Sequence, residues 1–306
     1  MKKNINVHVV VASSTHKYFD YFIRNSLHTA QYPSRVMFYC YALDKETYSA
    51  YSNSEKVSGC YPVYKDKGAF RLVTLREWMV FLRYKLTGNS GLAGSNGHSA
   101  GLNKIMKVMP TMPGHHVIAD SDVAILTHDW DTMIEEQFAD HHLIGTTYED
   151  IGGFSSGDGL VQTYKNFPNA NWVAIREDCD LTALDWFPRK EKNIKIDTDD
   201  KAKLYGLPVG YEMVCDGGWA FPQYASDRGY KSKAMKQVKS SSDQIQVLTT
   251  NNTYNEEYQL DGQAFVGHQR GGSHIAFRAS EISISFYDCV EAAVGQPTPP
   301  NSEFDK

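Results

Sequence analysis

Two aspartates separated by one residue, Asp120 and Asp122, lie between the apolar runs 117–119 and 123–126. This position predicts the carboxyl end of a buried strand, where open α/β sheets bind their ligands. Alternation along a strand aims both carboxylates to the same side. Two adjacent carboxylates repel each other unless a cation joins them, and hard divalent cations take such oxygen ligands. The pair therefore predicts a metal site; the alternative is a capping aspartate followed by a turn aspartate.

The Asp-x-Asp pattern alone is not specific, because it also occurs at 129/131, 178/180 and 197/199. The pair at 129/131 fits a helix N-terminus, where aspartate satisfies free backbone N–H groups. The pairs at 178/180 and 197/199 are expected in solvated loops. Only the flanking apolar runs distinguish 120/122 from the other three.

A second cluster lies near the end of the chain, where an apolar run enters a polar loop. Its chemistry-bearing residues are His268, Arg270, Gly271, Gly272, Ser273 and His274. The glycines let backbone N–H groups approach an anion, and the arginine offers a planar fork for phosphate. A histidine here can complete a metal shell with the acidic pair, and His268 and His274 both qualify. Each histidine alone is equally consistent with a hydrogen-bonded surface or core residue.

A third cluster surrounds Asp216, which precedes Gly217, Gly218 and Trp219. Such a carboxylate can act as a general base, with the tryptophan as a platform for a sugar face. Glu212 lies four residues earlier and is the substitute for this role. The alternative is a helix-capping aspartate before a buried tryptophan.

The elements that must position these residues indicate an α/β protein, since strand, helix and strand follow one another from the start. After residue 150, aromatics, prolines and charges mix without clear periodicity until about 210, which predicts an irregular, ligand-facing half. Lys231, Lys233, Lys236 and Lys239 predict a solvated helix face. The apolar runs predict strands over 5–12, 35–43, 116–119, 123–126 and 142–147, and helices over 16–30, 69–86, 102–109 and 129–138.

Composition limits the partners. The chain has 306 residues, is 42% hydrophobic and carries a net charge of −5, with a pI near 6.1. Nucleic acid is therefore not an expected partner, because phosphate contacts need a basic face. No apolar run approaches the roughly 18 residues of a membrane helix, and the start does not resemble a signal peptide, so a cytoplasmic location is expected. The five cysteines show no Cys-x-x-Cys spacing and are expected to be reduced and mostly buried.

In their order and spacing, these clusters resemble those of GT-A glycosyltransferases, the nucleotide-sugar-dependent enzymes with a Rossmann-like sheet. The first strand ends in Ala12, Ser13, Ser14 and Thr15, where the nucleotide loop of that family begins. The segment from His98 to Lys104 is similar to the helix start that precedes the metal strand. Asp120-Ser121-Asp122 resembles the metal motif, and His268 with 270–273 resembles the late histidine segment. The stretch 213–222 resembles the one that carries the acidic base.

The resemblance implies a Rossmann-like GT-A fold, with a mixed, mostly parallel central sheet flanked by helices. It implies one domain over 1–292, with a nucleotide-binding half (1–150) and an acceptor-side half (151–292), and a flexible tail over 293–306. The implied cofactor is Mn²⁺ or Mg²⁺, held by Asp122 and His268 with Asp120 at the metal or the ribose. The implied donor site comprises Ala12, Ser13, Ser14, Thr15, His98, Asn103, Lys104, Asp120, Ser121, Arg270, Gly271, Gly272 and Ser273.

The implied reaction moves a sugar from a UDP-sugar to a hydroxyl of a glycan or small saccharide. Asp216, or Glu212 in its place, would accept the proton of that hydroxyl, which implies inversion at the anomeric carbon. One competing function is a sugar-phosphate nucleotidylyltransferase, but the loop after the first strand lacks the glycines and arginine of such enzymes. A second is a non-catalytic carbohydrate- or nucleotide-binding protein, which would not need the clustered acidic pair and the late histidine.

Overall fold

The central sheet has seven strands and is built around β1 (Ile5–Val11), whose seven residues are all buried. Apart from the antiparallel β8, each pair of neighbours in the sheet is parallel, which confirms the predicted mixed, mostly parallel α/β fold. In spatial order the strands are β11 (Ser232–Ala234), β6 (Leu143–Gly145), β8 (Trp172–Ile175), β4 (His115–Ala119), β1, β2 (Val36–Ala42) and β3 (Gly59–Pro62). The structure is a computed structural model, and it describes residues 2–66, 95–148, 160–161, 163–238, 254–270 and 281–296.

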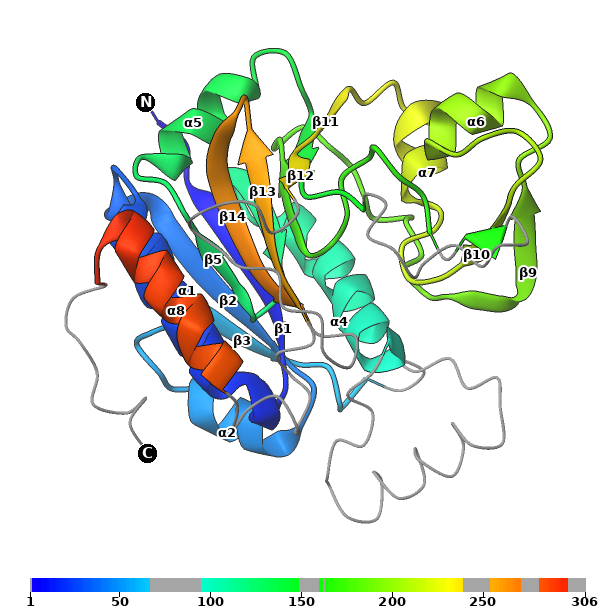
Figure 1. The fold of residues 1–306 in the computed structure, drawn as a ribbon. Helices are drawn as coiled ribbons and strands as arrows, with labels where there is room; N and C mark the ends of the chain where they lie inside the picture. Colours follow the sequence, from blue (N-terminus) through cyan, green and yellow to red (C-terminus); the bar gives the residue numbers. More distant parts are fainter. Residues whose placement is uncertain are drawn as a thin grey trace.

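Helices cover both faces of this sheet (Figure 1). On one face, Val7, Val9 and Val11 of β1 pack with Phe19 and Phe22 of α1 (His16–Thr29). On the other face, Val10 packs with Ile105 of α4 (Ser95–Val108). The helix α8 (Glu281–Val294) contributes Phe286 and Val290 to a third cluster beside α1 and β5. Because alternate β1 residues face different helices, both faces of the strand are buried, including the polar Asn6 and His8.

The helix α4 begins earlier than the predicted helix over 102–109, so Gly97 and Gly101 lie inside it. A Cβ atom on Gly101 would lie only 2.5 Å from both Cγ atoms of Val10. Glycine therefore lets α4 approach β1 more closely than any other residue would allow. The glycine-rich sequence hid the first turns of the helix because glycine is a poor helix former in isolation. The predicted helix over 69–86 lies outside the described residues.

A second, antiparallel sheet joins parts of the chain that are far apart in sequence. Its strands are β12 (Lys236–Val238), β13 (Tyr254–Leu260), β14 (Gln263–Arg270) and β5 (Val123–Ile125). The predicted lysine-bearing helix is wrong: Lys233 lies on β11 and Lys236 on β12. Lys233 instead pairs with Asp261 in the turn between β13 and β14. Lys239 lies outside the described residues.

The third sheet forms a smaller lobe, at the right of Figure 1, together with α6 (Asp199–Tyr205) and α7 (Phe221–Asp227). Its strands are β7 (Leu160–Val161), β10 (Glu212–Cys215) and β9 (Arg189–Lys195). The expectation of an irregular segment up to about 210 was wrong, because this part of the chain forms β7, β9 and α6, and also β8, which is fully buried in the central sheet. Two shorter helices, α2 (Lys45–Tyr51) and α5 (Trp130–Gln137), and the 3-10 turns Ser13–Thr15, Pro33–Arg35 and Met109–Thr111 complete the described elements.

Two general expectations can be compared with the described residues. None of the described helices combines the length and the apolar character needed to cross a membrane. The cysteines are free thiols, and Cys40, Cys179 and Cys215 are buried while Cys60 and Cys289 are partly exposed. The prediction of reduced, mostly buried thiols is thus confirmed.

A buried histidine pair links β1 and β4. His8 Nδ1 lies 3.0 Å from the Tyr41 hydroxyl, and His8 Nε2 lies 3.0 Å from His116 Nδ1. Burial is the main cause that lowers the pKa of both histidines, that of His116 to about 4. The two rings are therefore neutral in the folded protein at neutral pH, so each carries one N–H, and one of these donates across the contact between them.

This pair predicts a loss of stability in mild acid. An unfolded histidine titrates near pH 6.5. Below that pH the unfolded state therefore binds protons, while His8 and His116 of the folded state stay neutral. The free energy of unfolding should therefore fall as the pH drops from 6.5 toward 4, by up to about 1.4 kcal/mol per pH unit for each neutral histidine. Urea unfolding at pH 7, 6 and 5 measures this slope. His116→Gln should reduce it, and an unchanged slope in that variant would contradict the assignment.

Candidate metal centre

The acidic pair lies where the chain leaves the central sheet for the second sheet. β4 ends at Ala119 and β5 begins at Val123, so Asp120 and Asp122 occupy the turn between them. The backbone N–H of Asp120 donates to the Asn171 carbonyl, next to β8, at 2.8 Å. The prediction that the pair follows a buried strand is confirmed. The convergence of the two carboxylates arises from this turn rather than from alternation along a strand.

His268 reaches the pair through strand pairing. β14 runs antiparallel to β5, with His268 directly opposite Val123, the residue after Asp122. The N–H of Gln269 donates to the Asp122 carbonyl at 2.9 Å, which extends the pairing by one step. His268 is 3% exposed. The backbone register therefore decides that this histidine faces the acidic turn.

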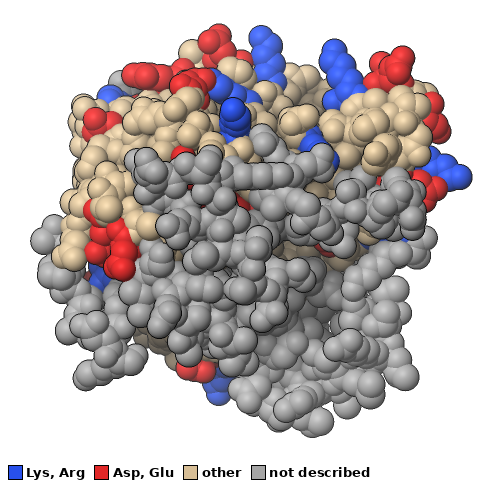
Figure 2. All heavy atoms as spheres, in the orientation of Figure 1, with Lys and Arg blue, Asp and Glu red and all other residues tan. Residues whose placement is uncertain are grey.

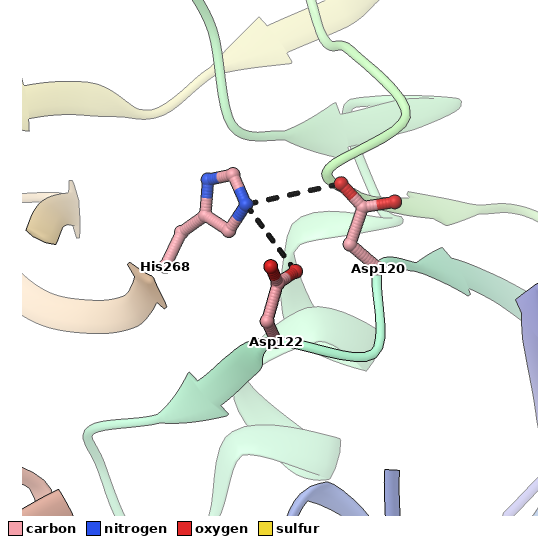
Figure 3. A group of neighbouring side chains, drawn as sticks. All are labelled: Asp120, Asp122 and His268. Carbon is pink, nitrogen blue, oxygen red and sulfur yellow. Dashed lines mark ion pairs between the residues drawn. The ribbon is translucent and has the colours of Figure 1, made fainter. Parts of the chain in front are cut away.

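The three side chains converge on one point, with His268 Nε2 directed at both carboxylates (Figure 3). Nε2 lies 3.6 Å from Asp122 Oδ1 and 3.8 Å from Asp120 Oδ2. These separations are too long for hydrogen bonds. They fall between the roughly 3 Å and 4.2 Å expected for neighbouring and opposite ligands bound about 2.1 Å from one ion. Among the described residues, this is the group of acidic and histidine side chains that could hold a metal ion.

A buried glutamate behind His268 is a residue that the sequence did not reveal. Glu256 Oε2 lies 2.8 Å from His268 Nδ1, and Glu256 is 1% exposed. A carboxylate on one ring nitrogen leaves the other nitrogen free for a metal, the arrangement usual around metal-bound histidines. The available signal was its place on β13, opposite His268, but that register is not visible in the sequence.

Charge around His268 makes cation binding dependent on pH. Burial by itself lowers the pKa of His268, but the carboxylates of Asp122 and Glu256 outweigh it and raise the pKa to about 10. Without a cation, the ring is therefore protonated at neutral pH and neutralises the carboxylates around it. A metal ion on Nε2 must displace that proton, so metal affinity should weaken as the pH falls.

His98 also lies at this centre, as the resemblance implied. It is in the first turns of α4, and its Nε2 lies 2.9 Å from Asp120 Oδ1. Burial opposes charging of the ring, but Asp120, with a smaller effect of Asp122, raises the pKa of His98 overall. Asp120 is thus shared between His98 and His268. Ser121 between the two aspartates is buried.

The loop after β1 lies at the carboxyl end of the same sheet. Ala12 and Thr15 are buried, while Ser13 and Ser14 are partly exposed. Asp44, after β2, accepts hydrogen bonds from the N–H groups of Ser13 at 2.8 Å and Thr47 at 2.7 Å. This buried carboxylate therefore joins the loop to the start of α2. It was not singled out from the sequence.

The structure places Asn103 and Lys104 apart from the metal centre. They line a cavity of about 330 Å³ between α4 and residues 182–187. Asn103 Oδ1 accepts from the N–H of Trp186 at 3.0 Å, and Lys104 pairs with Asp66 at 2.9 Å. The first contact attaches α4 to the segment 182–187, and the second attaches it to the chain just after β3.

The two candidate bases occupy different surroundings. A Cβ atom on Gly217 would lie 3.4 Å from Ser99 Oγ, so the loop that carries Asp216 packs against α4 at Ser99. Asp216 is exposed, and its Oδ1 accepts from the N–H of Gly217 at 2.8 Å. It does not cap α7, whose N-cap residue is Ala220. Glu212 lies at the other end of β10, where it faces Asn193 at 3.3 Å and Lys195 at 3.9 Å.

Asn171, opposite Asp120, and Asn169, two residues earlier, carry donors that the described residues leave unused. Asn169 is 1% exposed and Asn171 is 8% exposed, and Nδ2 of each has no hydrogen-bond partner among the described residues. Asn171 precedes β8 and lies opposite Asp120, because the pairing of Ala119 with Trp172 continues by one residue. Buried amide donors without a partner are costly, so a ligand with hydroxyl or phosphate oxygens would relieve them.

The other Asp-x-Asp pairs do not form metal sites in the described structure. Asp129 is the N-cap of α5, as expected, but it makes no side-chain cap, and the buried Asp131 pairs with Arg35 at 2.9 Å. Asp178 pairs with Arg176, and Asp197 pairs with Lys201. The late segment 271–274, with Gly271, Gly272, Ser273 and His274, lies outside the described residues.

The surface charge is mixed. On the face shown in Figure 2, the described lysine and arginine side chains lie interspersed with aspartate and glutamate. Binding of an anion at the acidic turn would therefore depend on a cation and on local donors.

Comparisons with known proteins by sequence found no match, either to a family model or to a curated protein. Three solved structures are similar to the chain at low identity. They are the apo form of the glycosyltransferase GlyE of Streptococcus pneumoniae TIGR4 (11% identity, TM-score 0.32, 77% of this chain and 46% of that chain), S. aureus TarS (14%, 0.34, 71% and 36%), and the apo form of mouse xyloside xylosyltransferase 1 (7%, 0.37, 77% and 86%).

The chain thus spans less than half the length of the first two proteins. The named activities among these structures are sugar transfers.

Proposed function

We propose that this chain is a glycosyltransferase that moves a sugar from a UDP-sugar to a hydroxyl of a glycan or small saccharide, and that it needs Mn²⁺ or Mg²⁺. The observation that carries the proposal is the convergence of Asp120, Asp122 and His268 at the carboxyl end of the central sheet. Ligands of open α/β sheets bind at that end. Two carboxylates and one imidazole suit a divalent cation that is also bound by phosphate oxygens.

Each residue has a defined task in the proposed reaction. Asp122 and His268 would hold the cation, and Asp120 would hold the cation or the ribose. The bound cation would stabilise the charge that develops on the departing UDP. Ser13, Ser14 and His98 lie at the same end of the sheet and would contact the nucleotide. The unused donors of Asn169 and Asn171 would bind sugar or phosphate oxygens.

Asp216 would take the proton from the acceptor hydroxyl. It is exposed, so it is accessible to a saccharide, and its loop packs against α4 at Ser99, the residue after His98. Attack by that hydroxyl on the face opposite UDP would invert the anomeric carbon. We further propose that residues 1–292 act as one unit, since the metal ligands come from both the first and the second half of the chain.

Melting temperature measured with UDP, with and without Mn²⁺, tests the function. UDP at a hundredfold its Kd should stabilise the protein by about 2.7 kcal/mol when Mn²⁺ is present, and by much less without it. A panel of UDP-sugars then identifies the donor by release of UDP. A protein that shows no metal-dependent shift with UDP would rule the proposal out. A shift without turnover of any UDP-sugar would support a binding protein instead.

A further inference from the structure

Three hydrogen-bonded contacts of Glu256 lie within the described part of the chain. It lies directly opposite His268 in the pairing of β13 with β14. Its Oε2 accepts from the Tyr258 hydroxyl at 2.7 Å and faces His268 Nδ1 at 2.8 Å. Its Oε1 accepts from Gln237 Nε2 at 2.8 Å. All four side chains are at most 4% exposed.

These contacts determine which nitrogen of His268 carries a proton. Both the tyrosine and the glutamine donate to Glu256, which stabilises the carboxylate as an anion despite its burial. An anionic carboxylate can only accept, so His268 Nδ1 must donate to it. Once a cation has displaced the second proton, the lone pair of the neutral ring is on Nε2, which points at Asp120 and Asp122 (Figure 3).

We propose that Glu256 is a positioning residue that makes His268 a strong nitrogen ligand, and that this contact sets a preference of the centre for Mn²⁺ over Mg²⁺. The inference rests on the proposed function only in that a divalent cation binds at Asp120, Asp122 and His268. Mg²⁺ prefers oxygen ligands and retained water, whereas first-row transition ions also accept imidazole nitrogen. A carboxylate on Nδ1 makes the imidazole a better donor and fixes its orientation. Loss of that carboxylate should therefore lower the affinity for Mn²⁺ more than the affinity for Mg²⁺.

The strand offers a matched control. Glu257 is the next residue, is 2% exposed, and is paired with Gly267 rather than with His268. Since successive residues of a strand face opposite sides, Glu257→Gln makes the same chemical change away from the metal centre.

The test compares Glu256→Gln with Glu257→Gln in the full chain, with UDP present. Mn²⁺ binding is measured by the loss of the free-ion EPR signal, and Mg²⁺ binding by competition with Mn²⁺. We expect Glu256→Gln to raise the Kd for Mn²⁺ about 10- to 100-fold. The Kd for Mg²⁺ should change much less, so the ratio of the two constants falls. Glu257→Gln should leave that ratio as in the wild type.

If Glu256 had a purely structural role, Glu256→Gln would lower the affinity for both cations equally. The ratio of the two constants would then be unchanged, and that outcome would overturn the proposal. Pulsed EPR of the wild type gives a second reading that needs no variant: bound Mn²⁺ must show ¹⁴N coupling from one imidazole, and its absence overturns the proposal. If the wild type binds UDP without any metal dependence, the proposed function itself fails. If the wild type passes that test and only the Mn²⁺ preference is unaltered in Glu256→Gln, the inference alone fails.

Discussion

The Asp122→Asn variant should lose at least about 10³-fold in kcat/KM for sugar transfer, which corresponds to about 4 kcal/mol of transition-state stabilisation. Asparagine keeps the shape of the side chain but removes one of the negative charges that face His268 Nε2 at 3.6 Å. A cation held by fewer charges binds more weakly and stabilises the departing UDP less. Steady-state kinetics at saturating Mn²⁺ measure the loss. The metal-dependent rise in melting temperature with UDP should disappear in parallel.

A matched control comes from another Asp-x-Asp pair. Asp197 is exposed and contacts Lys201, so Asp197→Asn makes the same change outside the metal centre. Its kcat/KM should stay within about twofold of the wild type, because exposed ion pairs contribute little. If Asp122→Asn retained the UDP shift with Mn²⁺, the acidic turn would not be the metal site.

The Asp216→Asn variant should reduce kcat by about 10²- to 10⁴-fold, the usual contribution of a general base. Asparagine cannot accept the proton of the acceptor hydroxyl. Because Asp216 lies outside the group of metal ligands, UDP binding with Mn²⁺ should be unchanged. The measurement is kcat with saturating donor and acceptor, together with the melting temperature in the presence of UDP and Mn²⁺.

Glu212→Gln separates the two candidate bases. Glu212 is on the same short chain segment, but it faces Lys195 and Asn193 on the smaller sheet. This variant should keep nearly full kcat. The reverse pattern, with Glu212→Gln inactive and Asp216→Asn active, would transfer the role to Glu212. Full activity in both variants would remove the basis for an inverting mechanism that uses either residue.

Strands that are rich in apolar and β-branched residues were predictable from the sequence. β1, β2, β4 and β6 are central strands, and buried parallel strands consist of apolar and β-branched residues on both faces. The amphipathic α1 was equally clear. Such local patterns depend only on which side chains can be buried, and not on which strands are neighbours.

Elements that depend on a contact with another strand or helix were not predictable from the sequence. β8 has four residues, and only its place between β4 and β6 makes it a central strand. The lysines of β11 and β12 suggested a helix because these short strands show no alternation of apolar and polar residues. Lys233 pairs with Asp261, a contact that the sequence does not reveal. The first turns of α4 were hidden because Gly101 is explained by contact with Val10, which is a tertiary contact.

For the candidate site, the sequence by itself determined the inventory: an acidic pair after a buried strand, a late histidine, and a carboxylate before two glycines. Only the tertiary structure decided which of them meet. The antiparallel pairing of β14 with β5 brings His268 to Asp122, and that of β13 with β14 brings Glu256 to His268. Register is set by burial of whole strand faces against one another, so no short motif can encode it. The chemistry was therefore readable from local residues, whereas its geometry belongs to the packed sheets.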